Sequence, residues 1–211
     1  MVTRLEEERK RIARELHDEA GQELVSIRLS LQLLQAKVNQ VQPNQSNLKA
    51  EFDNVRKQIN AAGKRLSAVS YQLRPPLLDE SGLQAALDQL IREMRTRSQL
   101  SIDFQSKVYS ERLPSEIEIN CYRIVQEGLT NIFRYAQASD VQIILLQEEA
   151  TLSLKIIDDG IGFDPDQIRP KALGLLGIRE RVTMLNGDLE IDSKLGEGAT
   201  LSVSIPLAEV E

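Results

Sequence analysis

The sequence predicts an antiparallel helical hairpin that dimerises into a four-helix bundle, followed by a two-layer α/β sandwich. Apolar residues recur every three or four positions in two long segments, which a polar turn separates. After two consecutive prolines, Pro75 and Pro76, shorter helical and strand patterns alternate. We therefore expect one domain over residues 1–75 and a second over residues 76–211.

The two long segments carry narrow apolar seams. The first seam consists of Leu24, Ile27, Leu31, Leu34, Val38 and Val41, and the second of Leu48, Phe52, Val55, Ile59, Ala62, Leu66, Val69 and Leu73. Alternating spacings of four and three residues are typical of coiled-coil helices. The turn over residues 42–47 is short and contains Pro43, which favours an antiparallel hairpin. Seams this narrow cannot form a core within one hairpin, so we expect a homodimer that buries the seams of two chains.

The start of the first helix differs from the rest in rhythm and charge. Before Leu24 the apolar spacing drifts from the strict 3.5-residue period. The charged run over residues 6–11 is expected to form a solvated helical face, with ion pairs four residues apart such as Glu7 with Arg11.

Alternating patterns predict the elements of the second domain. We expect helices over residues 82–97, 115–136 and about 175–185, and strands over residues 100–105, 141–147, 152–158, 189–193 and 200–206. Helices and strands of these lengths form one sheet packed against helices. Pro75 and Pro76 end the hairpin before this domain because proline cannot continue a helix.

Composition limits the class of protein. The 211 residues carry a net charge of −6, which argues against direct nucleic-acid binding, since such surfaces are usually basic. The single cysteine, Cys121, cannot form an internal disulfide, so we expect a reducing, cytoplasmic setting with this side chain packed in the core. No segment approaches the ~18 apolar residues of a membrane span, and no signal peptide opens the chain. Membrane attachment is expected only through a missing N-terminal region.

His17 is the only histidine in the sequence and lies on the first predicted helix. Its neighbours four residues before and three and four residues after are Ala13, Ala20 and Gly21, so little side-chain volume surrounds the imidazole. A neutral imidazole can attack a phosphoryl group, and the adjacent carboxylate of Asp18 can take up the ring proton. A surface histidine on a charged helix would give the same pattern, so both interpretations stay open at this point.

A polar face late in the helix predicted over residues 115–136 is a candidate metal and phosphate site. Glu127 and Asn131 are four residues apart and therefore share a face. Their oxygen atoms suit Mg²⁺, which binds side-chain oxygens together with substrate phosphates. Arg134, three residues beyond Asn131, can reach the same phosphates. An ordinary polar face on a half-buried helix is the alternative.

The loop that begins with Asp158 is a candidate binding wall for a flat ligand. It follows directly after a predicted strand, and Gly160 and Gly162 come next. A carboxylate at a strand end can accept a hydrogen bond from an exocyclic amine such as that of adenine, and glycines let the backbone approach the ring. The alternative is an ordinary acidic turn.

Two further glycine-bearing segments lie later in the chain. Gly174 and Gly177 stand at the entry to a predicted helix, which favours phosphate binding. Gly196, Gly198 and Thr200 lie between the last two strands, where a plain hairpin turn is the alternative. The sequence contains neither the GxxxxGK[ST] P-loop nor the His-Arg-Asp loop of protein Ser/Thr kinases.

These motifs follow one another in an order typical of one family. Residues 11–22, which include His17, resemble the phosphoacceptor box of sensor histidine kinases of the nitrate-sensor type, and residues 73–83 resemble the domain junction of the same group. Residues 127–135 resemble the N box of the GHKL (Bergerat) ATPase superfamily, residues 158–162 its first glycine box, and residues 174–181 and 196–200 its later glycine boxes. The resemblance covers nearly the whole chain in the right order and spacing.

The resemblance implies a kinase that uses ATP and Mg²⁺ to phosphorylate His17. It also implies transfer of the phosphoryl group to an aspartate of a response regulator, which has a receiver domain and a LuxR-like helix-turn-helix output. Asp18 would remove the proton of His17. Gln22 would position water for dephosphorylation of the regulator.

The resemblance also implies roles in the second domain. Asn131 would ligate Mg²⁺ with Glu127 close by, Arg134 would contact phosphate, and Asp158 would bind the adenine amine. The segment over residues 163–177 would form the ATP lid. The remaining implied nucleotide contacts are Tyr135, Gly160, Gly162, Gly174, Gly177, Gly196, Gly198 and Thr200.

Two positions depart from the family pattern. Tyr135 stands where many members have histidine, and Ala172 stands where the second glycine box usually begins with glycine. The second change could stiffen the lid or reshape its phosphate contact. Neither removes a proposed catalytic group, so we expect an active kinase.

Two other functions remain open alternatives. One is a degenerate kinase that serves as a dimeric scaffold, against which the intact Asp158, Asn131 and His17 argue. The other is an ATPase without phosphotransfer, in which Glu127 activates water, although the helical hairpin with its single histidine is then unexplained. Whether His17 is phosphorylated in cis or in trans across the dimer is also open.

Overall fold

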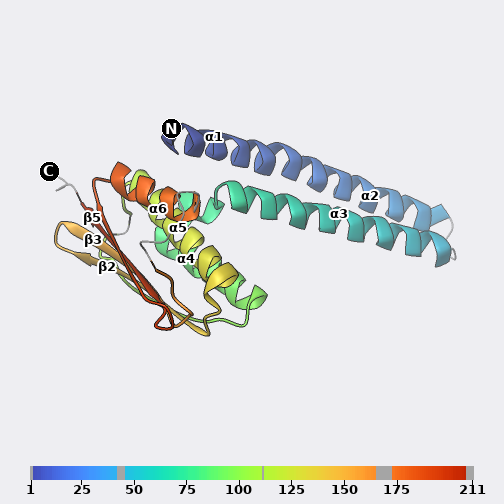
Figure 1. The fold of residues 1–211 in the computed structure, drawn as a ribbon. Coiled ribbons are helices and arrows are strands. Elements are labelled where there is room, and N and C mark those ends of the chain that lie inside the picture. The colour runs from blue at the N-terminus through green and yellow to red at the C-terminus, as the bar shows by residue number, and fades with distance from the viewer. Residues whose placement is uncertain (1, 42–45, 111, 165–172, 208–211) are drawn as a thin grey trace. The chain divides into compact units, whose positions relative to one another are not determined.

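The N-terminal unit of the computed structural model ends at Pro76 and is a hairpin of two helical arms (Figure 1). The first arm comprises α1 (Val2–Glu15), the π-helical turn η1 (Leu16–Ala20) and α2 (Gly21–Val41), and the second arm is α3 (Ser46–Leu73). The structure describes residues 2–41, 46–110, 112–164 and 173–207. Both predicted helices are confirmed, whereas most of the predicted turn, residues 42–45, lies outside the described residues.

The hairpin covers only part of each predicted seam. On α2 the half-buried seam residues are Leu24, Leu31 and Val38, and on α3 they include Phe52, Ile59 and Leu66. In both sets the members are seven residues apart and face the other arm. The intervening seam residues are exposed, namely Ile27, Leu34, Val55, Ala62 and Val69. Each arm therefore carries a second apolar row that its own hairpin does not cover.

The π-helical turn η1 interrupts the first arm at residues Leu16–Ala20 and was not predicted. A π-turn contains one residue more than an α-turn, so the residues beyond it are rotated relative to those before it. This rotation agrees with the drift in apolar spacing before Leu24.

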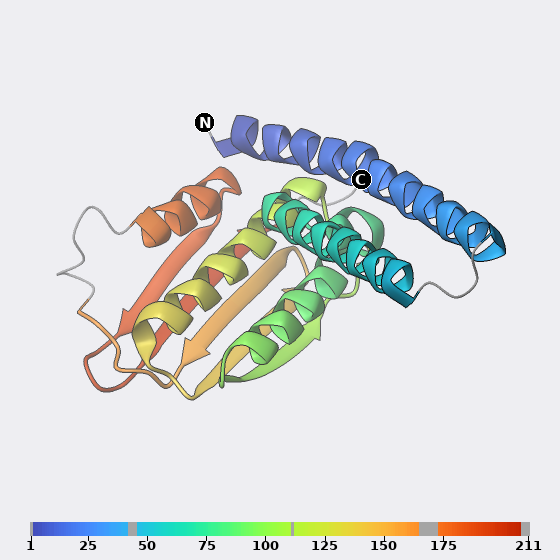
Figure 2. The same cartoon turned by 90° about the vertical axis from the view of Figure 1, so that its right-hand side faces the viewer.

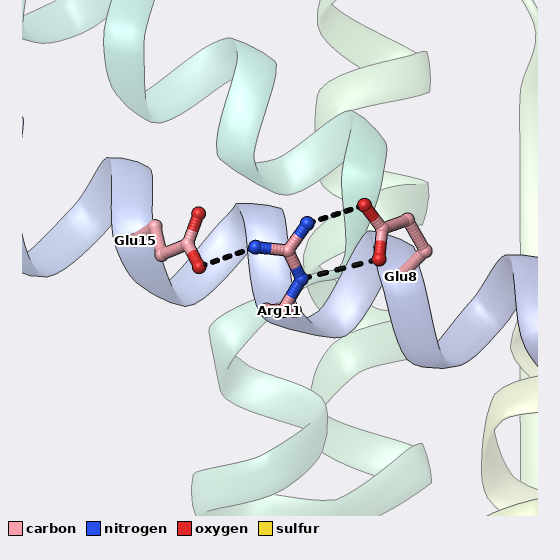
Figure 3. A network of polar contacts seen from close by, with 3 residues as sticks. All are labelled: Glu8, Arg11 and Glu15. Atoms are coloured by element: carbon pink, nitrogen blue, oxygen red, sulfur yellow. Dashed lines mark hydrogen bonds and ion pairs between the residues drawn. The ribbon is translucent and has the colours of Figure 1, made fainter.

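The charged start of α1 forms ion pairs along its surface, as predicted, although the partners of Arg11 differ from the predicted one. Arg11 donates to Glu8 at 2.5 and 3.1 Å and to Glu15 at 2.7 Å, rather than to the predicted Glu7 (Figure 3). These partners lie three residues before and four residues after Arg11, which are equally favourable spacings on a helix. All three side chains are exposed, so the pairs contribute little to stability.

The connection between the two units contains a helical turn that was missed. The helix α3 ends at Leu73 as predicted, but α4 (Pro76–Arg97) begins at the second proline rather than at Gly82. Proline is favourable at the first helical position because its missing N–H would have no partner there. Gly82, with φ 82° and ψ −176°, breaks α4 into the short turn before it and the longer helix after it.

The second unit, from Leu77 onward, is a five-stranded sheet with helices on one face (Figure 2). Its remaining elements are β1 (Ser101–Lys107), α5 (Ser115–Asn131), the π-helical turn η2 (Ile132–Ala136), β2 (Asp140–Glu148), β3 (Thr151–Asp158), α6 (Leu173–Met184), β4 (Asp188–Ser193) and β5 (Ala199–Pro206). The strand order is β1-β2-β3-β5-β4, with β1 parallel to β2 and all other pairs antiparallel. The predicted sandwich of one sheet and one helical layer is confirmed.

Alternation along the strands places the core between the sheet and the helices. Val141, Ile143 and Leu145 of β2 are fully buried, and Leu154 of β3 is the register partner of Leu145. The buried Cys121 of α5 lies in the same core, as expected. Among the described residues, no helix is long and apolar enough to cross a membrane.

Candidate active site

The candidate phosphoacceptor lies in the π-helical turn of the first arm. His17 belongs to η1, where Asp18 is exposed, and Gln22 is exposed at the start of α2. A Cβ atom added to Gly21 would meet no described atom within 4 Å. Packing within one hairpin therefore does not require glycine at this position, and the space beside it stays open to another surface.

Glu127 and Asn131 lie near the C-terminal end of α5, and α6 begins directly against them. A Cβ atom added to Gly174 would overlap Oε1 of Glu127 and would lie 3.2 Å from the side-chain amide of Asn131. A side chain at position 174 would require the carboxylate of Glu127 to move away. The folded chain therefore brings the glycine-bearing start of α6 against the N box.

The turn η2 carries the two other candidate residues of the N box. Arg134 and Tyr135 are both exposed in this π-helical turn, which directly follows Asn131. Gln137 then adopts a left-handed conformation with φ 51° and ends the helix. The predicted helix over residues 115–136 is confirmed in extent, although its last turn is wider than an α-turn.

The loop after Asp158 is fixed against the end of η2. The N–H of Ile161 donates to the carbonyl oxygen of Ala136 at 2.8 Å, and the N–H of Gly160 donates to Oδ1 of Asp158 at 2.9 Å. A Cβ atom added to Gly160 would overlap the Ala136 carbonyl oxygen. The candidate adenine-binding loop thus meets the helix five residues after Asn131.

The turn between β4 and β5 closes onto the same loop. The N–H of Gly196 donates to the carbonyl oxygen of Ile161 at 2.7 Å. A Cβ atom added to Gly198, whose φ is 78°, would overlap the carbonyl oxygen of Asp158. Gly162, with φ 58°, lies against the same turn. Residues of two separate glycine motifs therefore come together at one end of the sheet, next to the end of the N box.

Ser193 joins the turn to the start of the predicted lid, and the sequence analysis missed it. Its buried hydroxyl accepts a hydrogen bond from the N–H of Phe163 at 2.9 Å and donates to the carbonyl oxygen of Gly198 at 2.9 Å. Both partners are main-chain groups, so no pairing of side chains in the sequence indicates this role. The position directly before a glycine-bearing turn was the available signal.

Asp159 also has a structural role that was not predicted. Its Oδ1 accepts hydrogen bonds from the N–H groups of Ser139 and Asp140, at 2.7 and 2.9 Å. These bonds fix the beginning of β2 to the end of β3. Asp159 is therefore a loop-forming residue, whereas its neighbour Asp158 keeps its carboxylate beside the candidate ligand wall.

The two adjacent carboxyl groups differ in acidity. Burial raises the pKa of Asp158, and the nearby charge of Asp159 adds to this, while the N–H groups of Gly160 and Ala199 act in the opposite direction. The hydrogen bonds from Asp140 and Ser139 lower the pKa of Asp159. Thr200 is half-buried beside this site, one residue after the register partner of Asp158.

The predicted lid is described only at its two ends. Phe163 and Asp164 are half-buried at its beginning, and α6 carries its end. Residues 165–172, including Ala172, lie outside the described residues. A Cβ atom added to Gly177 would meet no atom within 4 Å in the described part of the chain, so packing does not explain this glycine.

The candidate Mg²⁺ ligands fit an ion that arrives with a nucleotide. Within the described ranges, no group of three or more His, Cys, Asp or Glu side chains could hold a metal ion. Mg²⁺ commonly takes only one or two protein ligands and completes its shell with water and phosphate oxygens. The half-buried Glu127 and Asn131 offer two hard oxygen donors on one helical face.

Two family models match the chain. One, described as histidine kinase, matches residues 8–78, and the other, described as histidine kinase-, DNA gyrase B- and HSP90-like ATPase, matches residues 116–209. The first covers most of the hairpin, and the second covers the elements from α5 to β5. Together they account for both units in the order in which the motifs were predicted.

Two curated relatives align with nearly the whole chain. The signal transduction histidine-protein kinase/phosphatase DegS of Brevibacillus brevis is 32% identical over 206 residues, which cover 98% of this chain and 53% of that protein. The oxygen sensor histidine kinase NreB of Staphylococcus carnosus (strain TM300) is 32% identical over 213 residues, which cover 99% of this chain and 59% of that protein. The chain spans little more than half the length of these relatives.

A solved structure shares the fold. The histidine kinase domain of the blue-light activated histidine kinase EL346 of Erythrobacter litoralis matches with a TM-score of 0.58 and 19% identity. The match covers 98% of this chain and 94% of that one. With both family models and both relatives in agreement, the chain belongs to the sensor histidine kinases of the nitrate-sensor type, in which a phosphoacceptor region precedes a GHKL-type ATPase domain.

Proposed function

We propose that this chain is the catalytic core of a sensor histidine kinase. It transfers the γ-phosphoryl group of ATP to His17 and then to an aspartate of a response regulator. Residues 1–75 form the dimerisation and phosphotransfer domain, and residues 76–211 form the catalytic domain. The family membership supports this activity, and so does the proximity of the N box to the glycine-bearing loops in the second unit.

One observation carries the proposal. Segments far apart in the sequence meet around the C-terminal end of α5: the N box, the Asp158 loop, the β4–β5 turn and the start of α6. Each of them contributes at least one glycine or one polar side chain to the place where they meet. Such a combination of main-chain and polar groups suits a flat base joined to phosphates.

In this proposal the Asp158 loop binds the adenine. Ionised Asp158 accepts a hydrogen bond from the exocyclic amine, and the backbone at Gly160, Gly162 and Gly198 forms the wall beside the ring. Phosphate contacts come from Arg134, whose guanidinium donates several hydrogen bonds. The remaining nucleotide contacts are Tyr135, Gly174, Gly177, Gly196 and Thr200.

Asn131, with Glu127 beside it, would hold Mg²⁺. When bound, the ion neutralises charge on the phosphates and orients them. The contribution of the chain is to place the two oxygen donors on one face of α5, next to the entry of α6.

The transfer step forms one bond and breaks another. A ring nitrogen of neutral His17 attacks the γ-phosphorus, so that a nitrogen–phosphorus bond forms while the bond to the β,γ-bridging oxygen breaks and ADP leaves. The other ring nitrogen gives its proton to the carboxylate of Asp18. Positioning and neutralisation of charge supply most of the rate enhancement in such a reaction.

A homodimer is part of the proposal. Ile27 and Leu34 on α2 and Val55 and Val69 on α3 are exposed in the single hairpin, although they continue the coiled-coil seam. A second copy that presents the same rows covers them in a four-helix bundle.

The response regulator is assigned to a different face of α2. Val25, Leu29 and Leu33 are exposed and four residues apart, so they form a row on one side of the helix. Leu29 is two residues from Ile27, which places this row on roughly the opposite side from the dimer seam. The row begins eight residues after His17, within reach of a docked receiver domain. Gln22, between them, positions water for dephosphorylation of the regulator.

Labelling with [γ-³²P]ATP and Mg²⁺ tests the proposed function. We expect acid-labile label on the wild-type chain and none on His17→Gln. The Asn131→Ala variant loses label because it no longer turns over ATP. Asn54→Ala, which changes an exposed asparagine on α3, is the matched control and keeps the label.

The same experiment separates the two alternatives. A chain that binds no ATP supports the scaffold, and a chain that hydrolyses ATP without becoming labelled supports an ATPase. Label that persists in His17→Gln contradicts the assignment of the phosphoacceptor.

A further inference from the structure

Arg112 connects the start of α4 to the start of α5 through four hydrogen bonds. Its Nε and Nη2 donate to the two carboxylate oxygens of Glu118 at 3.1 and 2.9 Å. Its Nη1 donates to the carbonyl oxygen of Asp79 at 3.0 Å, and Nη2 also donates to the carbonyl oxygen of Leu78 at 3.2 Å. One guanidinium therefore holds a side chain of the ATPase unit and the backbone of the segment that enters it.

The electrostatics of this cluster favour a fixed geometry. The Glu118 side chain is only 2% exposed, and its salt bridge with Arg112 neutralises a carboxylate that would be costly to bury alone. Glu118 lies in the first turn of α5, where negative charge is favourable, and Arg112 lies at carbonyl groups of a short helical turn, where positive charge is favourable. The bidentate contact also sets the orientation of the guanidinium.

Gly82 allows the chain to pass over this pair. Its φ of 82° is a conformation that residues with side chains rarely adopt. An added Cβ atom would lie 3.3 Å from Oε1 of Glu118 and 3.5 Å from Cδ of Arg112. Leu78, 1% exposed, anchors the same segment in the core. The segment Leu77–Gly82, called the connecting segment below, is thus held by one apolar side chain and one guanidinium.

The cluster is distant from the candidate nucleotide residues along α5. Glu118 precedes Glu127 by nine residues and Asn131 by thirteen, or about 14 and 20 Å at the rise of an α-helix. Loss of the cluster would therefore leave the nucleotide-binding groups in place. It would instead change the connecting segment, through which the chain runs from the hairpin that carries His17 into the ATPase unit.

We propose that Arg112 and Glu118 form a latch that positions the connecting segment for phosphoryl transfer to His17 and has no part in binding ATP. The inference rests on the proposed histidine kinase activity. Transfer requires the reacting atoms to approach within about 3–3.5 Å, and small misplacements lower such rates strongly. Between α3 and α4, Arg74 and Pro75 are the two residues that belong to no helix, so the connecting segment follows α3 almost directly. Arg112 and Glu118 are thus positioning residues rather than catalytic ones.

Three full-chain variants test the latch. Arg112→Met combined with Glu118→Gln removes both charges, so no unpaired carboxylate is buried, but it also removes the contacts with Leu78 and Asp79. Glu118→Gln alone keeps those two carbonyl contacts and serves as the matched control. Arg112→Lys keeps the charge and loses the forked geometry.

Three measurements are compared for each variant: the Kd for ATP, the autophosphorylation rate at saturating ATP, and hydrogen exchange of the amides in the connecting segment. For the double variant we expect a Kd within about twofold of wild type, a rate reduced at least tenfold, and faster exchange confined to that segment. The autophosphorylation rate of Glu118→Gln should stay within about threefold of the wild-type rate. The rate of Arg112→Lys should lie between the rates of Glu118→Gln and the double variant.

Two results overturn the latch: a wild-type rate in the double variant, or a loss of rate that is matched by an equal loss of ATP affinity. The experiments can contradict the proposed function and the proposed latch independently of each other. A wild-type chain that takes up no label contradicts the proposed function, whereas hydrogen exchange in the double variant still decides whether Arg112 and Glu118 hold the connecting segment.

Discussion

The two units of this chain differ in how completely they bury their apolar side chains. In the ATPase unit, the inward-facing residues of β2 and β3 are buried by helices of the same chain, as Ile143 and Leu154 illustrate. In the hairpin, Ile27 and Leu34 remain 51% and 53% exposed although they belong to a regular seam. The ATPase unit therefore has a complete core of its own, whereas the hairpin leaves part of its apolar seam exposed.

This difference implies that the two units are stabilised in different ways. The unfolding of a unit with a complete core does not depend on protein concentration, whereas the unfolding of a hairpin that is stabilised by a second copy does depend on it. The same contrast bears on function. In the proposed kinase, the unit assigned to nucleotide binding has its own core, whereas the hairpin that carries His17 would be completed by a second copy of the chain.

The largest expected effect comes from charging the uncovered seam. Ile27→Asp with Leu34→Asp removes four apolar side chains from the interface of a dimer. Full burial of such a side chain is worth about 1.5–3 kcal/mol, and each is already about half-covered in the single hairpin, so the dimer adds about half of that value for each. The loss of about 3 kcal/mol or more corresponds to a rise in the dimer Kd of at least about 10²-fold. Sedimentation equilibrium measures it, and thermal unfolding of the hairpin should lose its dependence on protein concentration.

A matched control charges the opposite side of the same helix. Leu29→Asp with Leu33→Asp removes equally exposed leucines but should leave the dimer intact and slow phosphotransfer to the regulator instead. Dissociation of the dimer in this control would show that the assignment of the two faces is wrong.

The next largest effect concerns the completed core. Leu154 is 1% exposed, and Leu154→Ala should lower the free energy of unfolding of the ATPase unit by about 2–5 kcal/mol because it leaves a cavity. Leu195 is 76% exposed in the same unit, and Leu195→Ala should change it by less than about 0.5 kcal/mol. Urea unfolding followed by near-UV circular dichroism measures both, and the transition should be independent of concentration. Similar losses in the two variants would contradict the proposed core.

The fold was predictable from sequence to the extent that it follows periodicity. The apolar seams and the alternation of strands and helices gave both units their elements, with boundaries close to those observed. The helical turn from Pro76 was missed because two prolines were interpreted only as the end of a helix, although proline is also favourable at a start. The π-turns η1 and η2 have no distinct pattern, since one inserted residue looks like a small drift in spacing.

The candidate site was predictable where side chains carry the chemistry. Glu127, Asn131 and Asp158 were predicted from their spacing and from their positions at the ends of elements, and their roles stay predictions. Ser193 and Asp159 were missed because they bind main-chain N–H and carbonyl groups of segments distant in the sequence. Tertiary structure alone supplies those partners.

A smaller effect is expected at Ser193, which organises the loop at the candidate nucleotide site. Ser193→Ala leaves the N–H of Phe163 and the carbonyl of Gly198 without this partner, at a cost of about 1–3 kcal/mol. We expect this loss to destabilise the ATP-bound form relative to the free form, so that the Kd for ATP rises by about tenfold. Isothermal titration calorimetry measures it. Ser204→Ala, at an exposed position on β5, is the control, and equal Kd values in both variants would refute the role of Ser193.

The smallest effect contrasts two neighbouring carboxylates within the ATPase unit. Because burial raises the pKa of Asp158 in the folded state, the folded state binds more protons than the unfolded state just above the ordinary value of 3.8. Stability contributed by this group is thus lost as pH rises through that window. For Asp159, whose pKa is lowered, stability is present above the ordinary value and is lost as pH falls.

The two asparagine substitutions should therefore shift stability in opposite directions at pH 7. Without nucleotide, Asp158→Asn should raise the Tm of the ATPase unit slightly and Asp159→Asn should lower it, and both differences should shrink as the pH falls below the ordinary carboxyl pKa of 3.8. Differential scanning calorimetry across this range measures the shifts. Asp158→Asn should also weaken ATP binding, because the adenine amine loses a charged acceptor. A destabilised Asp158→Asn variant would mean that its carboxylate supports the fold rather than the ligand, and the distinction between the two aspartates would not hold.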